Sequence, residues 1–198
     1  MSFKVNNVTI NISFLFCIFV CFMVAFDKSG TVLLCFVFML FHELSHIIAM
    51  IFCRVKIKKL YFEPFGIYIE KEEKSLNAKQ DFLVLISGCF FNFAACFCFA
   101  VAFFALKNAT FLKCALINFA LCIFNALPIK NLDGGDVLLL LLNELKSVKN
   151  PLNTVKIISL ICCFGLFVLG VIICAKVRFN PSLIIVSVYL AFSLFLSA

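Results

Sequence analysis

Long apolar segments separated by short polar ones dominate the chain. A membrane-spanning helix needs about 20 consecutive apolar residues, and runs of this length recur between charged positions. We expect about six spans, at residues 8–26, 31–53, 82–106, 109–142, 155–175 and 182–198. The fourth is discontinuous, because polar and glycine residues interrupt it near 128–135. The pattern predicts an all-α polytopic membrane protein with one transmembrane domain over residues 1–198.

The first apolar run has the alternative of being a signal peptide. Its apolar core is long, however, and no small-residue cleavage pattern follows Phe26. We therefore expect a retained helix.

The segment between the second and third spans, residues 54–80, is the sizeable polar part of the chain. Apolar residues alternate with polar ones on both sides of Pro64–Gly66. Two alternating runs separated by Pro and Gly are typical of a β-hairpin. We predict a small hairpin that turns at Pro64–Gly66.

Positive charges predict the orientation of the spans. Lys and Arg number eleven on the side that holds the N-terminus and residues 54–80, against five on the opposite side. Because cytoplasmic loops carry the excess of positive charge, both termini should be cytoplasmic in a multi-pass protein of the cell membrane.

Composition supports a membrane location. The chain is 65% hydrophobic and 14% charged, so it lacks the polar surface of a soluble domain. Its net charge of +7 is explained by cytoplasmic loops, and we expect no nucleic-acid partner. Most of the 12 cysteines lie in apolar runs, without the spacing of a zinc ribbon, and are interpreted as reduced packing residues.

Candidate chemistry lies in the second span, in the segment His42-Glu43-Leu44-Ser45-His46. Residues i and i+4 share one face of a helix, so both imidazoles can reach one metal ion. A charged group at mid-membrane depth costs about 2.5–3.5 kcal/mol on insertion scales, so this cluster needs a partner. Zinc is one such partner, and Glu43 then lies where it can deprotonate a water molecule. The alternative is a buried structural hydrogen-bond cluster.

A catalytic zinc ion usually takes three protein ligands, so a third ligand is needed. Asp133 is the candidate, because it falls where polar residues interrupt the fourth span. Irregular backbone at membrane depth is tolerated when protein buries it or when it lines a polar cavity. Asp133 has the alternative of being the N-cap of a helix that resumes at Gly134. Asp136 is a competing ligand, although its position suits a first-turn acid near the helix dipole.

These residues resemble the site-2 proteases, a family of intramembrane zinc metalloproteases. His42–His46 is similar to the HExxH helix of the family. Residues 125–135, NALPIKNLDGG, resemble its Asn-x-x-Pro and Leu-Asp-Gly motif, with Asn131 where a second Pro is usual. Residues 87–92, SGCFFN, resemble its Gly-Pro-x-x-Asn motif, with Cys89 in place of Pro. Residues 61–67, YFEPFGI, are similar to a Pro-Phe-Gly hairpin in the branch that processes sporulation sigma factors.

The resemblance implies a zinc endopeptidase with one Zn²⁺ per chain. His42, His46 and Asp133 would be the metal ligands and Glu43 the catalytic base. Asn92 and Asn125 would donate hydrogen bonds to the substrate or the oxyanion, with helix–helix packing as the alternative. The expected substrate is a membrane-associated protein such as a pro-sigma factor or an anti-sigma factor, with a role in sporulation and with membrane regulatory subunits as further partners. We expect neither the PDZ domain nor the CBS domain of some relatives.

Two further expectations concern how a substrate reaches the metal. His46 would lie about 12 Å below the cytoplasmic boundary at Arg54, so cleavage should occur in the cytoplasmic half of the membrane. A substrate helix must unwind before its carbonyl groups are accessible, and the hairpin near Pro64–Gly66 would offer it an edge strand.

Other functions remain open from the sequence. A membrane zinc transporter or sensor could use the same ligands, and it would not require a carboxylate beside the first histidine. Membrane zinc proteases with a later glutamate ligand share HExxH, and Glu144 is the residue available for that role. An inactive relative is disfavoured because every catalytic position is filled.

Overall fold

The computed structural model describes residues 2–5, 8–27, 29–55, 57–63, 66–71, 77–145, 148–176 and 182–196. The chain divides into two compact units, Met1–Cys122 and Ile123–Ala198. The boundary falls in the last turn of α4 (Ala109–Asn125). The single transmembrane domain expected from the sequence stays a prediction.

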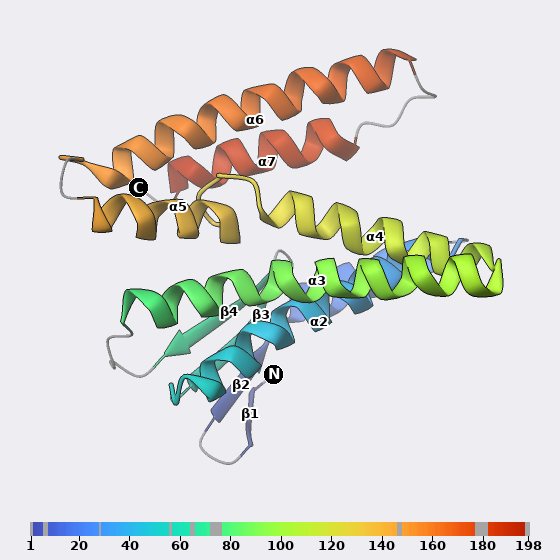
Figure 1. The fold of residues 1–198 in the computed structure, drawn as a ribbon, viewed down its shortest axis with the longest axis horizontal. Coiled ribbons are helices and arrows are strands. Elements are labelled where there is room, and N and C mark those ends of the chain that lie inside the picture. Colours follow the sequence, from blue (N-terminus) through green and yellow to red (C-terminus); the bar gives the residue numbers. More distant parts are fainter. Residues whose placement is uncertain are drawn as a thin grey trace. The chain divides into compact units, whose positions relative to one another are not determined.

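The first unit contains a four-stranded sheet in the order β1-β2-β3-β4 (Figure 1). Its strands are β1 (Ser2–Val5), β2 (Val8–Ile12), β3 (Ile57–Glu63) and β4 (Gly66–Lys71). β2 and β3 pair in parallel, and the two outer pairs are antiparallel. Parallel neighbours need a crossover, and here the crossover consists of the two helices between β2 and β3.

The prediction that a helix begins at Val8 is wrong. Residues 8–12 form β2, and helix α1 covers only Phe14–Phe26, which is 13 residues. At 1.5 Å per residue this helix is about 20 Å long, shorter than the hydrocarbon core of a bilayer at about 30 Å. The physical reason is that the β-branched Val8, Ile10 and Ile12 alternate with the polar Thr9 and Asn11, which is the period of a strand, and pairing with β1 and β3 stabilises this strand.

Strands β3 and β4 form an antiparallel pair in the segment where the hairpin is predicted. The turn itself stays a prediction, because Pro64 and Phe65 lie outside the described residues. Lys59 on β3 forms an ion pair with Glu70 on β4, with Nζ and Oε2 3.2 Å apart. The hydrogen bond to the Glu70 carboxylate raises the pKa of Lys59 above its usual value.

Two long helices of the first unit, α2 (Thr31–Phe52) and α3 (Ala78–Leu106), pack along each other (Figure 1). The buried residues of α2 recur every fourth position: Phe38, His42, His46 and Met50. Those of α3 follow the same spacing: Val84, Gly88 and Asn92. Spacing by four keeps each set on one helix face, so each helix presents a single buried stripe.

The start of α2 is stabilised by Asp27. Its Oδ2 atom accepts hydrogen bonds from the backbone N–H groups of Val32 at 2.7 Å and Leu33 at 3.1 Å. Desolvation raises the pKa of this carboxyl group, but hydrogen bonds from Leu33, Ser29 and Val32 outweigh it and lower the pKa to about 2. The carboxylate therefore satisfies N–H groups that have no partner within the helix.

The second unit contains α5 (Asp133–Glu144), α6 (Pro151–Lys176) and α7 (Ser182–Leu196). α6 and α7 lie side by side (Figure 1). Between them is a core of Cys163, Leu190 and Leu194, which also takes in Ile129 from the segment before α5. Ile129 is fully buried.

Three helices in the described part of the chain, α2, α3 and α6, are long and apolar enough to cross a membrane. α4 and α7 are apolar but shorter. The count of six spans therefore stays a prediction. All 12 cysteines are free, in agreement with their interpretation as reduced packing residues.

Candidate metal centre

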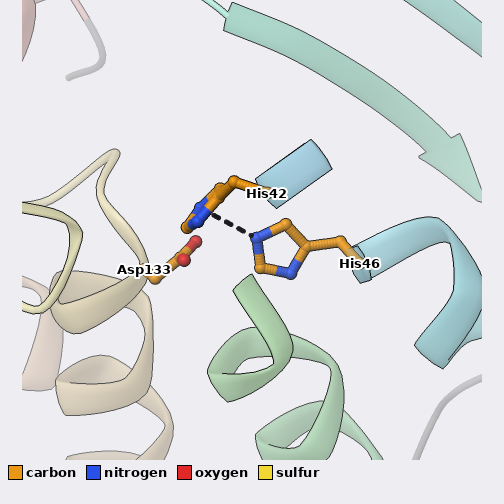
Figure 2. A group of neighbouring side chains, drawn as sticks. All are labelled: His42, His46 and Asp133. Carbon is orange, nitrogen blue, oxygen red and sulfur yellow. Dashed lines mark hydrogen bonds between the residues drawn. The ribbon is translucent and has the colours of Figure 1, made fainter. Parts of the chain in front are cut away.

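The two histidines of the HExxH segment face each other on the buried stripe of α2. Their Nε2 atoms are 3.3 Å apart, as Figure 2 shows by the dashed line. The His42 side chain is 3% exposed and that of His46 7%, so neither ring is exposed to the surroundings of the protein. Two ligands on a tetrahedral zinc ion, each about 2.0–2.1 Å from the metal, lie about 3.3–3.4 Å apart. The spacing of the imidazoles therefore fits zinc.

His46 is oriented by α3. Its Nδ1 atom lies 2.8 Å from the backbone carbonyl oxygen of Val84 and 3.2 Å from the hydroxyl oxygen of Ser87. The Ser87 hydroxyl group also donates to the Val84 carbonyl group at 2.7 Å. A carbonyl oxygen only accepts, so Nδ1 of His46 carries the proton and Nε2 keeps its lone pair. This is the tautomer that a metal ligand requires.

His42 contacts α3 one turn further along. Its Nδ1 atom lies 3.1 Å from Nδ2 of Asn92, whose side chain is fully buried. Both imidazoles are therefore held from behind by the same face of α3, while their Nε2 atoms are directed toward each other. Partners of this kind fix the orientation of metal-binding histidines.

Gly88 makes the close approach of α3 to the imidazoles possible. A Cβ atom at this position would lie 2.5 Å from Nε2 of His46 and 2.6 Å from Nε2 of His42, and it would also clash with Cε1 of His42. Real Cβ atoms do not approach other heavy atoms so closely. The sequence pointed to this glycine only through the resemblance to Gly-Pro-x-x-Asn, and the structure supplies its physical reason.

Cys89 occupies the position of the proline in that motif, and its thiol reaches toward α4. The Sγ atom of Cys122 lies 3.4 Å from the carbonyl oxygen of Cys89, and the Sγ atom of Cys89 lies 3.8 Å from the carbonyl oxygen of Cys122. Weak S–H donors therefore connect α3 to α4 beside Gly88.

Glu43 follows His42 on α2 and is half-buried. A helix turns by about 100° per residue, so its carboxylate leaves the helix beside the face that carries the imidazoles. From this position a carboxylate can act on a metal-bound water without itself binding the metal.

Asp133 is the first residue of α5, in the second unit, and is half-buried (Figure 2). The alternative that it is an N-cap is wrong, because Leu132 takes the N-cap position with extended backbone. Asp136 lies in the same first turn but is exposed, and Glu144 is exposed at the other end of α5. Asp133 is thus the more buried of the acidic candidates on α5.

The segment before Asp133 is held by its own unit. The backbone N–H of Lys130 donates to Oγ of Ser159 on α6 at 2.9 Å, and the Ser159 side chain is fully buried. At Gly134, a Cβ atom would clash with the carbonyl groups of Ala126 and Leu127. Gly134 therefore lets the chain fold back on the start of α5. Sequence reasoning missed Ser159, because a lone serine in an apolar helix carries no motif.

His42 and His46 offer two imidazoles to a metal ion, and the carboxylate expected from the sequence as a third donor is that of Asp133. The set suits zinc, which takes three protein ligands in catalytic sites. His42, His46 and Asn92 come together within the first unit, while Asn125, in the last turn of α4, and Asp133 belong to the second unit. The place of Asp133 beside the histidines stays a prediction.

Comparison with known proteins agrees with these features. Residues 30–113 and 105–169 match Peptidase family M50. The chain belongs to this family. The matched residues include the histidines of α2, the buried stripe of α3 and the start of α5. The resemblance to site-2 proteases is thereby confirmed, and the chain is a member of a family of membrane metalloproteases.

Two known proteins are similar to this chain. Stage IV sporulation protein FB of Bacillus subtilis (strain 168) is 33% identical over 166 residues, which cover 79% of this chain and 54% of that protein. The chain therefore spans about half the length of this relative. The Site-2 Protease from Methanocaldococcus jannaschii has the same fold, with a TM-score of 0.68 and 20% identity over 98% of this chain and 94% of that one.

Proposed function

We propose that this M50 protein is an intramembrane zinc endopeptidase that cleaves a membrane-associated protein. The observation that carries the proposal is the pair of buried imidazoles, with Nε2 atoms 3.3 Å apart, on an apolar helix of membrane-spanning length. An apolar helix tolerates such a cluster when a metal ion is its partner.

In this proposal His42, His46 and Asp133 hold one Zn²⁺. The tautomer of His46, its Nδ1 atom facing the Val84 carbonyl group, supports the first part of this assignment. The half-buried position of Asp133 on α5, compared with the exposure of Asp136, supports the second part. Bound zinc would supply Lewis acidity, which lowers the pKa of a water ligand toward neutrality and polarises the scissile carbonyl group.

Glu43 is the general base of the proposed reaction. Its carboxylate takes a proton from the attacking water and delivers it to the nitrogen of the leaving amine. Half-burial on an apolar helix reduces the contact of this carboxylate with bulk water, which favours proton transfer to and from the substrate. Asn125, half-buried at the end of α4, is a proposed hydrogen-bond donor to the substrate.

The substrate is proposed to bind as an extended strand at β4. Among the strands that the structure describes, β4 lies at an edge of the sheet and pairs with β3 alone. An edge strand can pair with an unwound segment of substrate through main-chain hydrogen bonds. A pro-sigma factor or an anti-sigma factor is the proposed substrate class, by analogy with the sporulation protein of Bacillus subtilis. We also propose that both termini are cytoplasmic and that membrane regulatory subunits bind the protease.

Cleavage and zinc content test the catalytic assignments together. The protein is co-expressed with tagged single-span candidate substrates, then purified in detergent for metal analysis. Glu43→Gln should abolish cleavage and retain one zinc per chain, because it removes the base and leaves the ligands. Asp133→Ala should lose both.

Asp136→Ala is the matched control, since it removes a carboxylate from the same turn of α5. Asp136→Ala should retain both cleavage and one zinc per chain. Loss of zinc in Asp136→Ala but not in Asp133→Ala would transfer the ligand role to Asp136. Zinc flux into vesicles without any cleavage would favour the transporter over the protease.

The edge-strand proposal has a separate test. A photo-crosslinking phenylalanine analogue is placed at Tyr68 on β4, and at Lys4 on β1, the opposite edge of the sheet. Crosslinks to a cleaved substrate should arise from position 68 and not from position 4. Equal crosslinking from both edges would contradict binding at β4.

A further inference from the structure

The buried amide group of Asn92 has a partner for its nitrogen atom and, among the described residues, none for its oxygen atom. Its side chain is fully buried, and Nδ2 lies 3.1 Å from Nδ1 of His42. Its Oδ1 atom is buried and has no hydrogen-bond partner among the described residues. A buried amide oxygen without a partner costs about 1–3 kcal/mol, so this arrangement calls for a physical reason.

Proton positions follow from the donors and acceptors present. An amide nitrogen only donates, so Nδ1 of His42 accepts from Asn92 and the proton of the neutral His42 ring is on Nε2. Nδ1 of His46 faces the Val84 carbonyl oxygen, so Nε2 of His46 has the lone pair. The His42 Nε2–H group then donates to Nε2 of His46 across 3.3 Å. With the amide in this orientation, Oδ1 of Asn92 has no partner among the described residues.

Metal binding requires the other tautomer of His42. Both Nε2 atoms need their lone pairs to act as ligands, so the proton of His42 must be on Nδ1. Nδ1–H then needs an acceptor in the place where Nδ2 of Asn92 now lies. A half-turn of the amide about its Cβ–Cγ bond puts Oδ1 there, because the amide oxygen and nitrogen are nearly equal in size.

We propose that Asn92 is a positioning residue that sets the tautomer of His42, with its amide oxygen accepting from His42 Nδ1–H in the metal-loaded protein. The half-turn gives Oδ1 a donor and moves Nδ2 to the place that Oδ1 now holds, so the hydrogen bond between Asn92 and His42 changes direction. This inference rests on the proposed zinc site and assigns Asn92 to the histidine, not to the substrate. Full burial of Asn92 and its contact with the imidazole support this assignment.

Two substitutions at position 92 distinguish the loss of a hydrogen-bond acceptor from a change in side-chain volume. Asn92→Asp keeps the shape and can only accept when ionised, so it should hold His42 in the metal-binding tautomer. Asn92→Leu keeps a similar volume and removes the acceptor. Loss of such a partner typically lowers metal affinity by about 10–100-fold.

Asn118→Leu is the matched control. Asn118 is also fully buried, its Oδ1 atom also has no partner among the described residues, and its Nδ2 donates to the Cys114 carbonyl group of its own helix at 2.9 Å. It therefore reports the cost of replacing a buried asparagine in the same unit without changing a contact of the histidines.

Zinc affinity is measured on the full chain in detergent, by competition with a chromophoric chelator. We expect wild-type affinity for Asn118→Leu, affinity within a few-fold of wild type for Asn92→Asp, and a loss of about 10–100-fold for Asn92→Leu. Nitrogen-15 spectra of labelled histidine should show a protonated Nδ1 at His42 in the zinc-loaded wild type.

Either of two results would overturn the role of Asn92: zinc bound by Asn92→Leu as tightly as by Asn118→Leu, or equal losses in Asn92→Asp and Asn92→Leu. Failure of the wild type itself to bind zinc would instead overturn the proposed function. The two failures are therefore distinguishable.

Discussion

Gly88→Ala would place a methyl group against both imidazoles of the proposed metal centre. The new Cβ atom would lie 2.5 Å from Nε2 of His46 and 2.6 Å from Nε2 of His42, while ordinary contacts begin near 3.4 Å. The overlap is therefore about 0.8–0.9 Å with each ring. Because the methyl group meets two rings at once, rotation of one ring cannot relieve it. The perturbation acts directly on the nitrogens that are proposed to bind zinc.

The size of the effect follows from overpacking of a buried site. An additional methyl group in a well-packed interior costs about 1–3 kcal/mol. If this cost opposes metal binding, zinc affinity falls about 5- to 140-fold, since each 1.4 kcal/mol is a factor of ten. If α2 and α3 move apart instead, the same cost appears as a lower thermal unfolding midpoint. Both quantities are therefore measured, the affinity by chelator competition and the midpoint on zinc-loaded protein in detergent.

Gly165→Ala is the matched control for this experiment. Gly165 lies on α6, where a Cβ atom would meet nothing within 4 Å. The substitution should leave zinc affinity unchanged and be neutral or slightly stabilising, because alanine is the better helix former. If Gly88→Ala equals Gly165→Ala in both measurements, the tight fit of α3 against the histidines is refuted.

Two further predictions concern residues that support the helices of the site. Asp27→Asn should lower the unfolding midpoint at pH 7. The pKa of Asp27 is lowered from 3.8 to about 2, so the ionised carboxylate stabilises the folded protein above pH 3.8, and this stabilisation is lost as the pH falls through 2. A difference between Asp27→Asn and wild type that stays constant from pH 7 to pH 2 would contradict the hydrogen-bonded carboxylate. Ser159→Ala removes the acceptor of the Lys130 N–H and should destabilise the segment before Asp133 by about 1–3 kcal/mol, with weaker zinc binding as the readout. Ser187→Ala is its control, because the one acceptor of this buried serine within the described part of the chain is a carbonyl group of its own helix. Equal effects of the two substitutions would contradict the role of Ser159.

Features with a local signal were predictable from the sequence. The helix that carries His42 and His46 follows from its apolar length and from i, i+4 spacing. The interruption of the apolar run before Asp133 follows from its polar and glycine residues, and α4 does end at Asn125 with α5 beginning at Asp133. In each case the residues that fix the local structure lie within a few positions of one another.

Features that depend on distant partners were not predictable. The parallel pairing of Val8–Ile12 with Ile57–Glu63 depends on residues about 50 positions away, although the alternation of Val8, Ile10 and Ile12 with polar residues is a local strand signal that the span expected at 8–26 overlooks. The contact between Asn92 and His42 joins residues 50 positions apart, and that between Lys130 and Ser159 joins residues 29 apart. Their hydrogen bonds follow from the packing of helices, which a single sequence does not display.

The parallel pairing of β2 with β3 has a consequence for biogenesis. Thr9 pairs with Lys59, so the ribosome must add 50 more residues before the partner of Thr9 exists. At about 5–20 residues per second, the nascent β2 waits about 2.5–10 s with an unsatisfied edge. During this interval α1 and α2 are made, and they form the crossover that parallel pairing of β3 with β2 requires. Pairing of β3 with β2 therefore indicates that the connection through α1 and α2 has formed.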